Sequence, residues 1–138
     1  GKAGRFGRFD TLFGARRFDF GPTALYGALQ RTNIIAPGLR LEAAPGKRDD
    51  VMVSYRAMWL ENPRDAFATT GVKDSSGASG RFAGHQAELR LRHWLVPDVL
   101  QAETGGAVLL KRGMLRTAPN APASGNSVYG YFDLTLTL

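Results

Sequence analysis

The stretch HQAELRLRHWL, residues 85–95, decides the fold because apolar and charged side chains alternate along it. Leu89 and Leu91 fall on one parity, and Arg90 and Arg92 fall on the other. Successive side chains of a β-strand point to opposite faces of its sheet, so a period of two separates these residues onto two faces. The stretch therefore predicts a strand with one apolar face and one charged face.

Four other segments show a similar pattern, and all of them are long. They are residues 34–44, 50–61, 99–111 and 127–138. Globular strands most often contain about 5–6 residues, whereas a tilted strand that crosses a membrane needs about 9–11 residues. The lengths of these segments therefore fit the membrane-spanning class better than the globular class.

The connections between the five segments alternate in length. Residues 45–50 (PGKRDD) and 96–98 (VPD) are short, whereas residues 62–84 and 112–126 are long and rich in Gly, Ser, Ala or Pro. Outer-membrane barrels combine short periplasmic turns with longer outer loops. We therefore expect an all-β fold. It is an antiparallel meander of about five long strands, with long loops on one side. The meander is either a small closed sheet or part of a larger transmembrane β-barrel.

The charged residues of the predicted strands share one parity. They are Arg40, Glu42, Arg56, Glu88, Arg90, Arg92, Glu103, Lys111 and Asp133. The opposite parity carries Leu, Val, Ala and aromatic residues, with His93 near a turn as its polar exception. Alternation alone fits both a soluble sheet and a barrel with an outward apolar face. A five-stranded sheet without a substantial helix has only itself or lipid to cover its apolar face, which favours the barrel.

The composition limits the classes of function. A chain of 138 residues is expected to form one domain. It contains no Cys, which excludes disulfides, thiolate metal sites and Cys nucleophiles. Its net charge of +6 favours an anionic partner such as a nucleic acid, an acidic lipid surface or an acidic polymer.

The start, GKAGRFGRFD, lacks an initiator Met and the apolar centre of a signal peptide, so we expect a processed chain or a fragment.

Four stretches carry a resemblance to a known family. They are RFDTLFGARRFDFGPTALYG (8–27), NIIAPGLRLEAAP (33–45), SGASGRFAGHQAELRLRHWLVPD (76–98) and NAPASGNSVYGYFDLTL (120–136). In them the sequence resembles the C-terminal part of the alginate export family of outer-membrane proteins.

The resemblance implies a larger single-chain barrel in the cell outer membrane. Such a barrel exports an anionic polysaccharide or sugar acid through a lumen rich in Arg and Lys, often with periplasmic export components. In this arrangement residues 1–33 form an outer loop that can include a short helix at 22–31, and residues 34–138 supply five strands.

The charged residues of that lumen are the functional candidates. They comprise the basic Arg40, Arg56, Arg90, Arg92 and Lys111 and the acidic Glu42, Glu88, Glu103 and Asp133. The arginines are expected to attract carboxylates, because a guanidinium stays charged and binds a carboxylate through a two-pronged fork. The acidic residues are expected to orient the arginines and to keep the polymer from binding too tightly to leave. The same pairs can instead serve only to stabilise the sheet through cross-strand contacts.

Other chemistry receives little support from the sequence. His85 and His93 lie more than about 20 Å apart on a regular strand, so we expect no metal site. Gly46-Lys47 lacks the glycine spacing and the Ser or Thr of a phosphate-binding loop. The serines of residues 75–80 (SSGASG) lack the context of a nucleophile elbow and indicate a flexible loop. Ion pairing is the simpler role for glutamates beside so many arginines, so we expect no enzyme and no cofactor.

Two other functions stay open at this point. A soluble β-domain that binds an anionic carbohydrate or another anion shares the alternating pattern. A nucleic-acid-binding domain needs aromatic residues interleaved with basic ones on one exposed face, whereas Tyr55 and Trp59 lie on the parity opposite the arginines. We therefore expect no nucleic-acid partner. Solubility without detergent would distinguish the soluble domain from the barrel.

Overall fold

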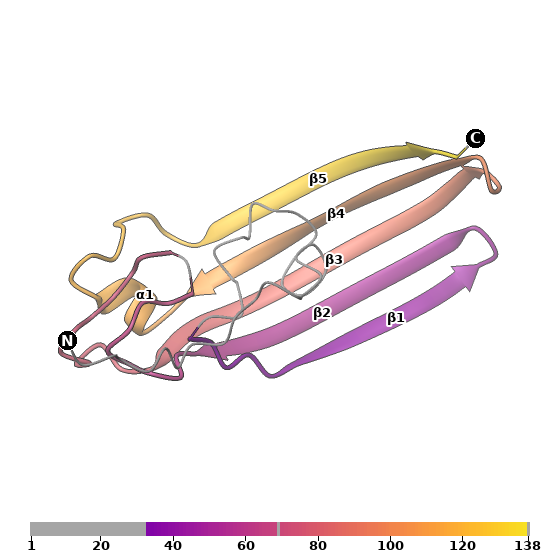
Figure 1. Ribbon diagram of the computed structural model, residues 1–138. Helices are drawn as coiled ribbons and strands as arrows, with labels where there is room; N and C mark the ends of the chain where they lie inside the picture. The colour runs from indigo at the N-terminus through magenta and orange to yellow at the C-terminus, as the bar shows by residue number, and fades with distance from the viewer. Residues whose placement is uncertain (1–32, 69, 138) are drawn as a thin grey trace, which may run out of the picture.

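The computed structural model describes residues 33–68 and 70–137. Their elements are β1 (Gly38–Gly46), β2 (Asp49–Trp59), β3 (Phe82–Val96), β4 (Leu100–Lys111), α1 (Met114–Thr117) and β5 (Ser127–Leu136). The strands form one sheet in the order β1-β2-β3-β4-β5, and each runs antiparallel to its neighbours (Figure 1). The predicted all-β meander is confirmed. The outer loop and the short helix predicted within residues 1–33 lie, apart from Asn33, outside the described residues.

The two ends of the sheet differ as the connection lengths predict. At one end, tight turns join β1 to β2 and β3 to β4, and Gly46 pairs directly with Asp49. At the other end, residues 60–81 and 112–126 form the two long connections (Figure 1). The sheet is open, with β1 and β5 at its edges. An open sheet fits part of a larger barrel, in which further strands pair with those edges.

The start of the first strand differs from the sequence-based expectation. β1 begins at Gly38 rather than at residue 34, and Ile35 forms only an isolated bridge with Trp59. Pro37 has no backbone N–H, so it cannot donate a hydrogen bond to a neighbouring strand. The regular ladder therefore starts after the proline.

The third strand is longer than expected because it contains a bulge. β3 begins at Phe82, which pairs with Trp59, whereas Gly84 pairs with the preceding Met58, so the register with β2 shifts between Phe82 and Gly84. A Cβ on Gly84 would lie only 2.2 Å from the carbonyl oxygen of Leu110. With a φ of +148°, this position accommodates glycine and no larger residue without displacement of the backbone.

Burial in the sheet is the reverse of that in a soluble domain. Apolar side chains of one face are exposed, among them Leu39, Leu41, Val53, Tyr55, Leu89, Leu91, Val128, Phe132, Leu134 and Leu136. On the other face, Glu88 and Arg90 are each 8% exposed, although Leu89 between them is 46% exposed. Because water-soluble sheets cover their apolar face, this arrangement suits a sheet with an apolar environment outside it.

The hydrophobic core of the described residues lies mainly in the two long connections. Its buried members are Met58, Leu60, Phe67, Ala68, Val72, Ala83, Leu109, Met114, Leu115 and Ala118. Residues 60–68, 70–81 and 112–126 pack together through this core, and we term them the loop cap. Leu60 was expected in a strand, but it follows the end of β2 and is fully buried in the loop cap.

Candidate functional site: a polar strip across the sheet

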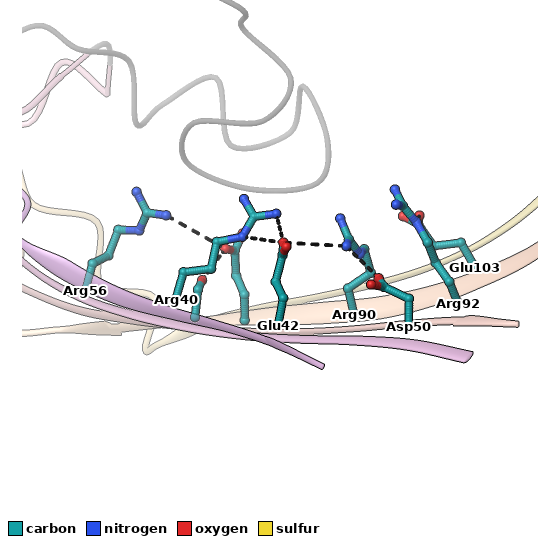
Figure 2. A network of polar contacts seen from close by, with 9 residues as sticks. Arg40, Glu42, Asp50, Arg56, Arg90, Arg92 and Glu103 are labelled. Atoms are coloured by element: carbon teal, nitrogen blue, oxygen red, sulfur yellow. Dashed lines mark hydrogen bonds and ion pairs between the residues drawn. The ribbon is translucent and has the colours of Figure 1, made fainter. Parts of the chain in front are cut away.

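The sheet register brings the predicted lumen arginines to one face. Arg40, Arg56, Arg90 and Arg92 project from the same side of the sheet (Figure 2). Facing residues of paired strands share a face, so the pairing of Arg40 with Ser54 and of Ser54 with Glu88 extends that side across three strands. We term the group on this face the polar strip. It comprises Arg40, Glu42, Asp50, Ser54, Arg56, Glu88, Arg90, Arg92, Glu103 and Tyr131.

Arg90 connects several members of the strip. Its Nη2 donates a hydrogen bond to Asp50 Oδ1 at 2.8 Å and lies 3.9 Å from Glu42 Oε1. Glu42 also accepts hydrogen bonds from Arg40, whose Nε lies 2.7 Å from Oε1. The Glu42 carboxylate therefore links Arg40 on β1 to Arg90 on β3 (Figure 2). Two guanidinium groups are held in place by this shared partner.

Arg92 and Glu103 form a second ion pair, between β3 and β4. Tyr131 on β5 donates its hydroxyl to Glu103 Oε1 at 2.7 Å, so one carboxylate receives donors from two neighbouring strands. Gly105 makes room for this contact, because a Cβ there would lie 2.7 Å from Cε1 of Tyr131. A larger residue at position 105 would push the tyrosine ring away from Glu103.

Glu88 has the least exposed carboxylate of the ion pairs in the strip. Its Oε2 accepts a hydrogen bond from Ser54 Oγ at 2.6 Å and lies 4.0 Å from Arg56 Nη2. Its Oε1 and the Nε of Arg90 are buried and make no hydrogen bond. Unpaired buried polar atoms are unfavourable, so these two atoms keep a capacity to bind a polar group.

Lys111 and Asp133 lie on the same face but outside the hydrogen-bond network of the strip. Lys111 is 8% exposed, and its Nζ donates to Ser124 Oγ at 3.0 Å. It forms no ion pair with a carboxylate of the described residues. Asp133 is exposed and faces Glu103 in the register of β4 and β5. The structure therefore gathers most, but not all, of the predicted lumen residues.

The sequence reasoning missed three members of the strip. Asp50 was placed where the first turn meets the second strand and was left out of the charged set, although it shares the parity of Arg56 on the same strand. Ser54 and Tyr131 carry no charge, so a search for charged residues passed over them. Their shared parity with the arginines was the available signal.

A family comparison adds to this geometry. The model of a family described as alginate export matches residues 1–125. The chain belongs to the alginate export family. The match includes β1 to β4, whereas β5 lies beyond it. No curated protein and no solved structure matches the chain.

The alginate export family comprises outer-membrane proteins that serve polysaccharide export. Along the strands of this family member, the acidic side chains of the polar face equal the basic ones in number. In the part of the chain that the structure describes, no helix has the length and apolar content needed to cross a membrane.

The two histidines of this family member lie on the apolar face. His93 Nδ1 is 2.7 Å from Asp49 Oδ1, and His85 Nδ1 is 2.7 Å from the Tyr55 hydroxyl. Asp49 is the first residue of β2 and shares the apolar face, whereas the sequence placed it in a turn. Among the described residues, no group of three or more His, Cys, Asp or Glu side chains is placed to hold a metal ion.

Asp74 organises a turn in the loop cap. It is 4% exposed and accepts hydrogen bonds from the hydroxyl and backbone N–H groups of Ser76 and Ser79, at 2.6 to 2.9 Å. These bonds, that from the Ser76 hydroxyl above all, hold the pKa of Asp74 well below its usual range. Residues 75–80 thus form a hydrogen-bonded turn, where the sequence indicated a flexible loop.

Proposed function

We propose that this chain lines an outer-membrane pore that passes an anionic polysaccharide or sugar acid, as a transporter and not an enzyme. The observation that carries the proposal is that the strands bury Ser54, Glu88 and Arg90 at the centre of the polar strip and expose apolar side chains on the opposite face. In a barrel, the apolar face contacts outer-membrane lipid and the polar strip faces the lumen. A soluble β-domain would instead leave Leu39, Leu41 and their neighbours in water.

The strip supports passage of carboxylates by exchange of partners. Arg90 and Arg92 are two residues apart on one face of β3, and are therefore about 6–7 Å apart along the strand. Each already holds an acidic partner, so a passing carboxylate competes with Asp50 or Glu103 for the guanidinium and does not meet an empty site. Competition weakens each contact and allows the polymer to move on. Periplasmic export components would deliver the polymer to the turn end of the pore.

Reversal of two strip charges tests the proposal. In the pore that contains this chain, Arg90→Glu combined with Arg92→Glu should lower the anion preference and slow the passage of an acidic oligosaccharide. Each substitution replaces an attractive charge with a repulsive one, a change of about 1 kcal/mol or more at partly screened distances. Neutral sugars should be little affected. Reversal potentials in a planar bilayer under a salt gradient measure the anion preference.

The matched control reverses two charges away from the strip. Lys47→Glu with Arg48→Glu makes the same change in net charge at an exposed tight turn and should shift the reversal potential less. Heat-modifiable gel migration must first show that both variants fold. An unchanged permeability ratio in a folded Arg90→Glu/Arg92→Glu variant would mean that the arginines only stabilise the sheet.

A further inference from the structure

We propose that the loop cap forms a fixed constriction inside the pore and sets the largest solute that can pass. This inference rests on the proposed function, and it separates two properties of the pore. The polar strip would set the preference for charge, and the loop cap would set the limit on size.

The loop cap packs on the polar face of the sheet. Met58, which belongs to its core, lies two residues from Arg56 on β2 and therefore on the same face. Lys111, also on this face, reaches the cap residue Ser124 through its Nζ at 3.0 Å. On the opposite face near the same end, Tyr55 stays 47% exposed. The cap therefore lies on the side that faces the lumen in the proposed barrel.

The two loops are fastened to each other by a side-chain clasp. Asn120 of the second loop donates its Nδ2 to the carbonyl oxygen of Gly71 at 2.8 Å. Its Oδ1 accepts a hydrogen bond from the backbone N–H of Lys73, also at 2.8 Å. One amide side chain thus satisfies two backbone groups of a segment that lies 47 to 49 residues away in the sequence. Together with the buried core, this clasp makes the cap a folded unit and not two free loops.

The position of the cap makes it a barrier to large solutes. A segment that packs on the inner face of a barrel occupies part of the lumen cross-section. The loops of the cap connect β2 to β3 and β4 to β5, so the cap lies at the long-loop ends of these strands (Figure 1). A polymer that moves along the polar strip must pass the cap at that end. The size limit therefore depends on how firmly Asn120 holds the two loops together.

The clasp can be removed without a change of charge. Asn120→Ala deletes both hydrogen bonds and should raise the single-channel conductance of the pore. It should also shift the exclusion limit for neutral polyethylene glycols toward longer polymers. Asn120→Asp, which does add a negative charge, keeps the acceptor for Lys73 and loses the donor to Gly71, so its exclusion limit for the neutral polymers should be intermediate. Ser75→Ala, at an exposed position of the same loop, is the control and should leave both properties unchanged.

The outcomes distinguish the constriction from the pore. A shifted exclusion limit with an unchanged reversal potential assigns the size limit to the cap and the charge preference to the strip. Unchanged exclusion limits in folded Asn120→Ala and Asn120→Asp variants would overturn the constriction and leave the pore proposal intact. A wild-type protein without conductance would overturn both proposals.

Discussion

The sheet and the loop cap bury opposite kinds of side chain. In the sheet, Glu88 and Arg90 are buried and Leu89 is exposed, whereas in the cap Phe67 and Met114 are fully buried. The cap is built as a water-soluble domain is built, by removal of apolar groups from water. The sheet has the pattern of a wall between lipid and a polar interior. On the polar face of β2, Arg56 belongs to the polar strip, and Met58, two residues further on, belongs to the apolar core of the loop cap.

The largest expected effect is the loss of stability caused by a cavity in the core of the loop cap. Phe67→Ala removes a fully buried ring, and such changes cost about 3–5 kcal/mol through lost burial and the cavity left behind. The cap should become accessible to protease while the sheet stays folded, which limited proteolysis in detergent micelles can show. Phe67→Leu is the matched control and should cost less. Equal protease resistance of the wild type and Phe67→Ala would contradict an independent core in the cap.

The second largest expected effect is destabilisation by a charge on the apolar face of the sheet. Leu89→Arg places a charge in the middle of the exposed apolar face, and should destabilise the protein in lipid vesicles by about 2–4 kcal/mol. Leu95→Arg, close to the tight turns, should cost only about 0–1 kcal/mol, because charges near the membrane interface are tolerated. Urea unfolding followed by the fluorescence of Trp59 and Trp94 provides the measurement. If Leu89→Arg instead made the chain soluble and more stable in plain buffer, the soluble β-domain would be the better interpretation.

The smallest effect concerns the acidic turn of the cap. The folded-state pKa of Asp74 is lowered, so its carboxylate contributes stability above the unfolded pKa of about 4. That contribution is lost as the pH falls below this value. The backbone N–H groups of Ser76 and Ser79 should therefore exchange slowly at pH 6 and faster in strong acid, after correction for intrinsic rates. In Asp74→Asn the exchange should be fast already at pH 6, whereas Asp98→Asn in a tight turn should leave it unchanged.

The faces of the strands could be predicted from the sequence, and the partners within them could not. A period of two separates Leu89 from Arg90 wherever the strand begins or ends. The partner of Arg90 depends on the register between β2 and β3, which brings Asp50 to its Nη2. Register depends on all the side chains of both strands and on the turns, so the sequence pattern of one strand does not contain it. The sequence therefore indicated a charged face, and only the structure showed the network.

The loop cap had no sequence signal of the same kind. Phe67, Val72, Met114 and Leu115 follow no period of two or 3.6, because they pack from irregular segments and a single short turn of helix. The Gly-, Ser-, Ala- and Pro-rich composition around them indicated long loops, and residues 75–80 were interpreted as a flexible loop. The clasp of Asn120 depends on a contact between distant segments, which no local pattern reveals.

The strand order β1-β2-β3-β4-β5 has a consequence for how the chain assembles. Every ladder joins neighbours in the sequence, and low separation between contacting residues favours fast folding. The tight turns pair β1 with β2 and β3 with β4 with only a small loss of chain entropy. These two hairpins are therefore expected to form first. Joining the hairpins, and then adding β5, requires closure of the two long connections. Closing the two long connections lowers the conformational entropy of the chain, and burial of the core of the loop cap offsets that loss. The apolar contacts of the loop cap therefore stabilise the last steps of assembly, in which the hairpins join and β5 is added.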